Sequence, residues 1–243
     1  MNKQTFLTLL ATFALLFSFT FSCHAKGKDK AKHVVFIGLD GWGAYSLPKA
    51  DMPNVKKLME DGAYTLKKRS ALPSSSAINW ASMFMGAGPE LHGYTEWGSK
   101  TPELPSRVLN KNGIFPTVFQ LLRDARPEAE IGCLYEWEGI KYLVDTLSLS
   151  YHYHVADCNK TPKELGNMAS SYIKEKHPAL VAICYDGPDH TGHTAGHDTP
   201  EYYEKLKELD VYVGQIVQAV KDAGLLDDTI FILTSDHGGI DKG

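Results

Sequence analysis

Three apolar runs in this sequence lead to aspartates, and two of these aspartates have a histidine beside them. VVFIGLD ends at Asp40, ALVAICYDGPD ends at Asp189, and TIFILTSDH carries Asp236 and His237. Carboxylates at the ends of buried parallel strands converge at one edge of a sheet, where open α/β sheets bind ligands. His193 follows Asp189 by four residues, and aspartate with histidine is a ligand set that divalent transition metals prefer. The pattern predicts a two-metal hydrolytic site.

Any one of these aspartates alone would more often be a helix cap or a turn residue, so their recurrence carries the prediction. DHGG is expected to place Asp236 and His237 on a tight turn that faces one ion. PDHTGH is expected to place Asp189 and His193 across a second turn. The glycines of both segments allow the backbone to bend closely around a cation.

The segment LPSSSAINWASM offers a nucleophile. Ser74, Ser75 and Ser76 precede an apolar-periodic helix, and one of them is expected to be its N-cap. The N-terminus of a helix also attracts anions, and a metal-bound serine there would ionise and attack phosphorus. Asn79 lies one turn after Ser76, where its amide would donate a hydrogen bond to a developing phosphate oxygen.

The elements that must position these residues alternate along the chain. Strands are predicted at 33–39, 63–69, 130–135, 180–185 and 228–234, and helices at 52–61, 75–85, 115–125, 161–175 and 200–223. This alternation predicts an α/β fold with a largely parallel central sheet and helices on both faces. Residues 86–112 are rich in Gly, Pro and Ser and predict a long loop over the site or a small insertion.

Composition limits the function classes. The 243 residues are 43% hydrophobic and 22% charged, which indicates one large globular domain or a core with an insertion. The net charge of −4 argues against a nucleic-acid scaffold, which is normally basic.

Residues 1–25 are predicted to be a signal peptide. Lys3 precedes the apolar stretch FLTLLATFALLFSFTF, which is too short and wrongly flanked for a membrane span. Cleavage is expected after Ala25, and lipidation of Cys23 is the alternative. Residues 26–32 are predicted to be a linker. The protein is therefore expected to be exported to the periplasm or the extracellular space, without a transmembrane span in the mature chain, or to be a membrane-anchored lipoprotein.

The other cysteines indicate no thiolate zinc site, because no CxxC pair is present. Cys133 and Cys184 lie in strand-like runs and are expected in the core. A disulfide that involves Cys158 remains open.

Several of these segments, in this order, resemble motifs of the alkaline phosphatase superfamily, most closely its nucleotide pyrophosphatase/phosphodiesterase branch. They are GLDGW, MPNVKKLMEDGAY, LPSSSAIN, GAGPELHG, PDHTGH and SDHGG, and the resemblance covers residues 33–243. It implies an alkaline-phosphatase-like three-layer sandwich. It also implies that Ser76 is the nucleophile and that Asn79 contacts phosphate.

The resemblance further implies two divalent metal ions, most simply zinc. One would be held by Asp40, Ser76, Asp236 and His237, and the other by Asp189, His193 and a further histidine. In the family that histidine lies beyond the Asp-His-Gly motif, and only GGIDKG follows His237 here. The catalytic domain, 33–243, is therefore expected to continue past Gly243. His190 and His197 are the alternatives.

The function that follows is hydrolysis of phosphodiester or pyrophosphate bonds in a small-molecule or nucleotide substrate, through a phosphoserine intermediate. Phosphomonoesterases of the superfamily usually have aspartate before the serine, where this chain has Ser75, and sulfatases need a Cys/Ser-x-Pro-x-Arg core that is absent. These enzymes, phosphonate hydrolases, transferases to an acceptor other than water and a non-catalytic metal-stabilised binding protein are the alternatives. Tyr94, Trp97 and Trp80 are candidates for stacking on a base.

Overall fold

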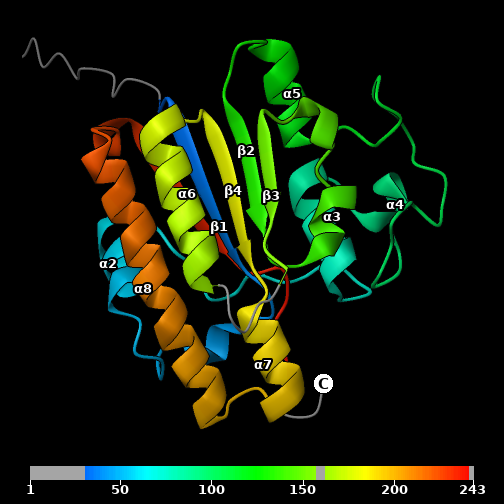
Figure 1. Cartoon of the computed structure of the whole chain (residues 1–243). Helices are drawn as coiled ribbons and strands as arrows, with labels where there is room; N and C mark the ends of the chain where they lie inside the picture. Colours follow the sequence, from blue (N-terminus) through cyan, green and yellow to red (C-terminus); the bar gives the residue numbers. More distant parts are fainter. Residues whose placement is uncertain (1–30, 157–161, 241–243) are drawn as a thin grey trace, which may run out of the picture. The chain divides into compact units, whose positions relative to one another are not determined.

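A sheet of five parallel strands, in the order β3-β2-β4-β1-β5, organises this chain. The structure is a computed structural model and describes residues 31–156 and 162–240. The strands are β1 (His33–Leu39), β2 (Ile131–Tyr135), β3 (Tyr151–His154), β4 (Leu180–Tyr185) and β5 (Thr229–Thr234). The prediction of a parallel sheet is confirmed (Figure 1).

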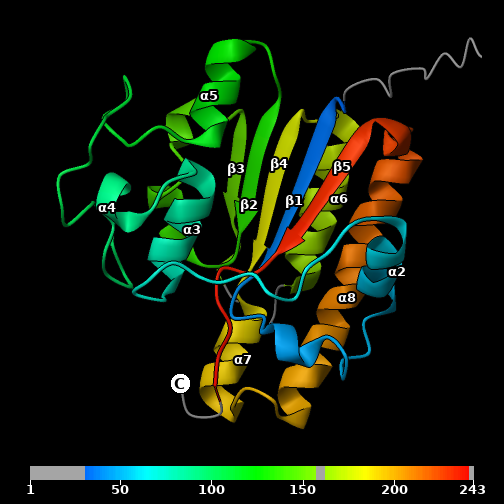
Figure 2. The ribbon, with the colours of Figure 1, turned by 180° about the vertical axis from the view of Figure 1, so that it is seen from behind.

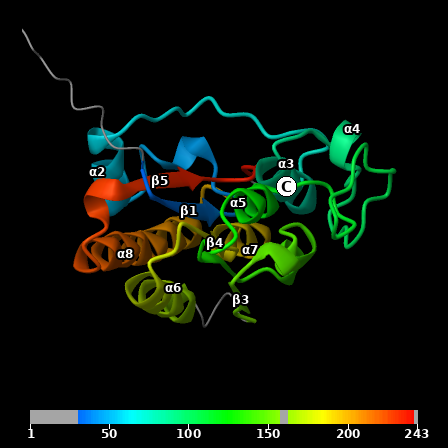
Figure 3. The ribbon, with the colours of Figure 1, turned by 90° about the horizontal axis from the view of Figure 1, so that it is seen from above.

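Helices cover both faces of this sheet, as predicted. They are α2 (Pro53–Asp61), α3 (Ser76–Met85), α4 (Pro89–His92), α5 (Val118–Ala125), α6 (Pro162–Lys176), α7 (Gly187–Ala195) and α8 (Pro200–Asp222). Helices α6 and α8 lie on one face and α3 and α5 on the other (Figure 3). The arrangement is the three-layer α/β sandwich that the sequence predicts.

The alternation of side chains along β1 explains the two cores. Val35, Ile37 and Leu39 are buried with α6 and α8, whereas Val34 and Phe36 pack against the core that contains α3 and α5. Strands covered on both faces need apolar residues at every position, which is why β1 and β4 are continuous apolar runs. Cys133 and Cys184 are free and buried in the second core, as expected.

The N-terminus of α2 is capped by a residue from another helix. Asp210, on α8, accepts a hydrogen bond with each of its two carboxylate oxygens. Oδ2 accepts from the backbone N–H of Asn54 at 3.0 Å, and Oδ1 accepts from the backbone N–H of Val55 at 2.8 Å. Asp210 is 1% exposed. This buried carboxylate satisfies N–H groups that have no intrahelical partner and fixes α2 against α8.

Three local expectations differ from the structure. Residues 63–69 belong to no strand: Tyr64 and Leu66 are exposed, and the segment runs from α2 to α3 beyond the edge strand β5 (Figure 2). Its alternating residues resemble a strand, but it pairs with no neighbour in the described part of the chain. Strand β3 and helix α7 are additional elements, and the 86–112 region contains the short helix α4.

Several predictions fall on residues 1–30, 157–161 and 241–243, which lie outside the described residues. They are the signal peptide, lipidation of Cys23, most of the linker, and the pairing of Cys158. Within 31–156 and 162–240, no helix combines the length and the apolar character that crossing a bilayer requires.

Candidate functional site

The proposed ligands lie at the carboxyl edge of the sheet, where three neighbouring strands end together. Asp40 directly follows β1, and Asp236 and His237 follow β5, its partner in the sheet. The third strand, β4, pairs with β1 on its other side and leads into α7, which lies beneath this edge (Figure 1). Parallel pairing therefore brings together residues almost 200 positions apart in the sequence.

Asp189 and His193 lie on helix α7, and the prediction that they lie across a turn is wrong. The strand ends at Tyr185, and a helix begins at Gly187, where Pro188 favours the first turn because its φ is fixed near the helical value. Asp189 and His193 are one helical turn apart, with His193 Nε2 3.3 Å from Asp189 Oδ2. Helical spacing thus gives both side chains one common face.

Asp40, Asp189 and His237 form a group that is compact enough for one cation. One ligand atom from each lies within 4.8 Å of the others. The Nε2 of His237 is 3.4 Å from Oδ1 of Asp40 and 3.4 Å from Oδ2 of Asp236. His193 is half exposed and extends the site from Asp189 toward solvent.

Ser76 is the first residue of α3 and points into this group. Its Oγ lies 3.5 Å from Oδ1 of Asp40 and 3.2 Å from Nε2 of His237. Ser75 is the N-cap, but its side chain makes no capping hydrogen bond. A hydroxyl between a carboxylate and an imidazole, at a positive helix end, is well placed to ionise.

The side chain of Asn79 braces the backbone around the serine. Its Oδ1 accepts from the N–H of Ala71 (2.7 Å), and its Nδ2 donates to the carbonyl of Ser75 (3.1 Å). Asn79 is 3% exposed. It therefore connects the 62–75 segment to the first turn of α3.

The site concentrates negative charge away from water. Burial, followed by the charge of Asp236 and the nearby charges of Asp186 and Asp189, raises the pKa of Asp40 well above its usual value. Burial also raises the pKa of Asp236. Buried like charges oppose one another, and a divalent cation among them would relieve both effects.

Two further observations show that these residues fit a divalent cation. Asp189 Oδ1 and Asp236 Oδ2 are buried polar atoms without a hydrogen-bond partner. Gly41 adopts φ +65, and a Cβ there would lie 2.7 Å from Asp189 Oδ1, so glycine permits the close approach of β1 to α7. Oxygen and imidazole donors in this number suit zinc and related ions.

Two contacts to the proposed ligands were not predicted from the sequence. The indole N–H of Trp80 donates to Oδ2 of Asp40 at 2.8 Å. Lys68, on the 62–75 segment, donates to the carbonyl of Ser235 and lies 3.5 Å from that of Asp236. The spacing of Ser76 and Trp80, one helical turn, was the one signal for the first contact; nothing in the sequence marks the second.

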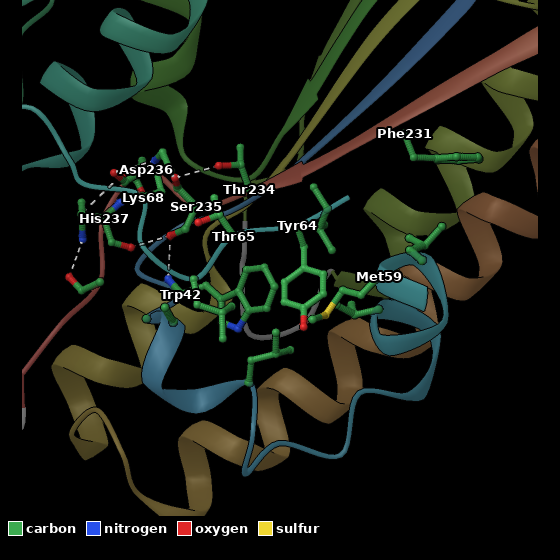
Figure 4. Close-up of a pocket in the computed structure, with 18 of the residues that line it drawn as sticks. Trp42, Met59, Tyr64, Thr65, Lys68, Phe231, Thr234, Ser235, Asp236 and His237 are labelled. Atoms are coloured by element: carbon green, nitrogen blue, oxygen red, sulfur yellow. Dashed lines mark hydrogen bonds and ion pairs between the residues drawn. The ribbon is translucent and has the colours of Figure 1, made fainter. Parts of the chain in front are cut away.

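A cleft of about 1940 Å³ extends from the site between the 62–75 segment and β5. Figure 4 shows Lys68 beside Ser235 and Asp236 at one end and Trp42 and Tyr64 farther along. Trp97 is 64% exposed and also lines the cleft.

The three aromatic candidates for base stacking differ in their exposure. Trp80 and Tyr94 are at most 2% exposed, so their proposed base stacking is wrong: the core occupies their faces. Trp97 remains available. His197 is buried, with its ring 6.2 Å from that of His193 and 5.3 Å from that of Tyr202. Neither His190 nor His197 belongs to the compact group of possible ligands found among the described residues.

The fold and site define an α/β domain with a serine beside an aspartate–histidine cluster. Residues 34–241 match the family model of type I phosphodiesterase / nucleotide pyrophosphatase. The chain belongs to this family, which confirms the resemblance found in the sequence.

Relatives with curated names agree with this assignment. The chain is 26% identical over 221 residues to bis(5'-adenosyl)-triphosphatase enpp4 of Mus musculus, covering 86% of this chain and 48% of the relative. It is 25% identical over 214 residues to ectonucleotide pyrophosphatase/phosphodiesterase family member 1 of Mus musculus, covering 84% and 24%. The chain thus spans about half, or less, of the length of these relatives.

A solved structure shares the fold. Murine ectonucleotide pyrophosphatase/phosphodiesterase 5, an inactive variant in complex with AMP, superposes with a TM-score of 0.68 at 20% sequence identity. The match covers 85% of this chain and 57% of the murine chain. The likeness shows that the two chains share the α/β architecture.

Proposed function

We propose that this chain forms the catalytic region of an exported, metal-dependent phosphodiesterase or nucleotide pyrophosphatase. The observation that carries the proposal is the convergence of Asp40, Asp189 and His237 within 4.8 Å, with the Oγ of Ser76 3.2 Å from the histidine. Family membership supports the same activity.

Two divalent ions, most simply zinc, would be held by the ligands that the sequence analysis names. Asp40, Ser76, Asp236 and His237 would hold one, and Asp189 and His193 would contribute to the other. When bound, the ions would supply Lewis-acid polarisation of the phosphoryl group and lower the pKa of the serine hydroxyl.

The residues of the chain supply the remaining steps. Ser76 Oγ gives its proton to water and forms a bond to phosphorus, while the bond from phosphorus to the leaving oxygen breaks and that oxygen takes up a proton from water. Water then cleaves the phosphoserine and regenerates Ser76. We infer that Asn79 would donate a hydrogen bond from its amide to phosphate oxygens when substrate is bound; without substrate the amide donates to the carbonyl of Ser75 at 3.1 Å.

The experiment compares initial rates on bis-p-nitrophenyl phosphate and p-nitrophenyl phosphate at alkaline pH. It uses the longest natural polypeptide that contains these residues, before and after chelation and zinc return. A metal-dependent preference for the diester supports the proposal. A preference for the monoester would favour phosphomonoesterase activity over the proposed function. Two bound metals without hydrolysis of any ester would favour a metal-stabilised binding protein.

Transfer to an acceptor other than water is the second candidate. Over 104 residues the chain is 33% identical to GPI ethanolamine phosphate transferase 3 of Schizosaccharomyces pombe, which covers 42% of this chain and 11% of the relative. Product analysis with alcohol acceptors decides between the two: a transferred phospho-group indicates a transferase, and free phosphomonoester alone indicates a hydrolase.

Export is proposed from the N-terminal sequence. Mass measurement of the mature N-terminus distinguishes cleavage after Ala25 from a lipid-modified Cys23, because the first product begins at Lys26, whereas the second begins three residues earlier, at Cys23, and carries acyl chains.

A further inference from the structure

Helix α7, which carries Asp189 and His193, begins with a capping arrangement that uses a residue from a distant strand. Asp186 is the N-cap of α7, and its side chain makes no capping hydrogen bond to the helix. The backbone N–H of Asp186 donates instead to Oε2 of Glu136 at 2.7 Å. Glu136 follows β2 directly and is 50 residues away in the sequence.

This contact replaces one half of a capping box. In a capping box, the third residue of the helix turns its side chain back to accept from the N–H of the N-cap. In α7 the third residue is Asp189, and its side chain lies with the proposed ligands, 3.3 Å from His193. Because Asp189 does not accept this hydrogen bond, Glu136 supplies the acceptor that the N-cap requires.

The backbone of Glu136 is fixed on both sides. Its N–H donates to the carbonyl of Cys184 at 3.1 Å, and its carbonyl lies 2.8 Å from Nε2 of His154. The side chain is 4% exposed. The first hydrogen bond connects Glu136 to β4, the strand that leads into α7, so the carboxylate has one defined position relative to the helix.

Burying the carboxylate of Glu136 costs free energy, which a residue without a role would not be expected to retain. Its Oε1 is buried and has no hydrogen-bond partner, and burial raises the pKa of Glu136 to about 8. An apolar residue of similar size would avoid this desolvation. The hydrogen bond to the start of α7 and the charge of Lys205 favour the carboxylate and partly offset this cost.

We propose that Glu136 is a positioning residue, which holds the first turn of α7 so that Asp189 and His193 are preorganised to bind a divalent cation. The inference rests on the proposed metal-dependent function. Groups that orient metal ligands typically change metal affinity by about 10- to 100-fold when removed, and Glu136 acts through the helix backbone, so we expect about 10-fold.

The test compares two neutral variants of similar size in the full natural polypeptide. Glu136→Gln keeps an oxygen acceptor for the N–H of Asp186, whereas Glu136→Met does not. Zinc affinity is measured by competition with a chromophoric chelator. We expect affinity about tenfold weaker for Glu136→Met, and within about threefold of wild type for Glu136→Gln.

Two further variants serve as references. His193→Ala removes a proposed ligand and gives the effect of losing the α7 site. Asp210→Leu removes the carboxylate that caps α2 and should lower the unfolding temperature with unchanged zinc affinity. Equal zinc affinity in wild type and Glu136→Met, together with a loss in His193→Ala, would overturn the role of Glu136 and leave the proposed function intact. Equal losses in the Met and Gln variants would also overturn it, since an acceptor would then be irrelevant.

A measurement on the wild type does not depend on whether a variant folds. Hydrogen exchange of the Asp186 amide should be strongly protected, and addition of zinc should increase protection across α7. Rapid exchange at Asp186 would contradict the proposal. Absence of zinc binding by the wild type would instead reject the proposed metal site.

Discussion

The indole of Trp80 and the carboxylate of Asp40 form a buried hydrogen bond, 2.8 Å long, that connects α3 to the end of β1. It occupies Oδ2 of Asp40 and leaves Oδ1 facing Ser76 and His237. One helix therefore supplies both the proposed nucleophile and, one turn later, the donor that orients a proposed metal ligand. Positions of this kind usually affect metal affinity when they are changed.

Trp80→Phe should weaken zinc binding about tenfold. Phenylalanine keeps most of the aromatic packing with Phe84 and Phe36 but leaves Oδ2 of Asp40 without its donor. Chelator competition measures the affinity. Phe84→Leu, which disturbs the same aromatic cluster without touching Asp40, is the control and should lower stability alone. Equal zinc affinity in wild type and Trp80→Phe would show that the hydrogen bond does not orient the ligand.

Ser76→Ala should lower turnover of bis-p-nitrophenyl phosphate by several orders of magnitude, because loss of a nucleophile abolishes the covalent route. Zinc should still bind through the carboxylates and His237. Steady-state rates and metal content test both parts. Turnover close to that of wild type would remove Ser76 as the nucleophile. Ser74→Ala, in the same segment, is the matched control and should retain activity.

Asn79→Ala should have two effects that separate its roles. Loss of the acceptor for Ala71 N–H should lower the free energy of unfolding by about 1–3 kcal/mol. Loss of a phosphate contact should lower turnover, but less than Ser76→Ala does. Denaturant unfolding and initial rates measure the two. A destabilised variant with unchanged turnover would leave Asn79 a purely structural role.

The sequence could place the carboxylate edge because strand ends are locally encoded. Asp40 follows a continuous apolar run, and such runs are typical of strands buried on both faces. Parallel order then brings Asp40 and Asp236 to one edge. The position of Asp189 was harder to predict, because Gly187 and Pro188 are typical of turns as well as of the start of a helix.

The remaining features depend on contacts between distant segments. Residues 63–69 alternate as a strand does, yet pairing requires a neighbouring edge, and the segment lies apart from β5 (Figure 3). Trp80 lies one helical turn after Ser76, but it also fits the apolar periodicity of its helix, so the sequence does not distinguish a donor to Asp40 from an ordinary core residue. Glu136 follows a strand as many acidic residues do, and its contact with the start of α7 arises only from the packing of β2 against β4.

Trp97→Ala tests whether the aromatic residue beside the cleft binds a base. Its ring is exposed and lies 6.3 Å from that of Trp137, so one face remains available for stacking. Removal of a stacking partner typically costs about 1–3 kcal/mol per base, and we expect KM for a dinucleotide substrate to rise at least fivefold. KM for bis-p-nitrophenyl phosphate is the control. An unchanged KM for the dinucleotide would exclude stacking on Trp97.

A buried histidine beside the nucleophile helix should make stability depend on pH. His92 is fully buried. Its Nδ1 accepts a hydrogen bond from the backbone N–H of Tyr94 at 3.1 Å. The proton of the neutral ring is therefore on Nε2, which lies 3.0 Å from Oγ of Ser82. Burial lowers the pKa of His92 below its value of about 6.5 in an unfolded chain. Between these two pKa values the unfolded state binds more protons, so stability rises with pH. The contribution is fully present above about pH 6.5 and is lost as pH falls toward the folded-state pKa.

His92→Gln keeps a donor and an acceptor but cannot titrate in this range, so it isolates the effect. Urea unfolding of the metal-free protein at pH 7.5 and pH 5 should show a larger loss of unfolding free energy for wild type than for His92→Gln. The comparison between the two proteins cancels the titration of the acidic site, which both share. Parallel losses in wild type and His92→Gln would show that His92 is protonated equally in both states. The connection between α4 and α3 would then not be sensitive to pH.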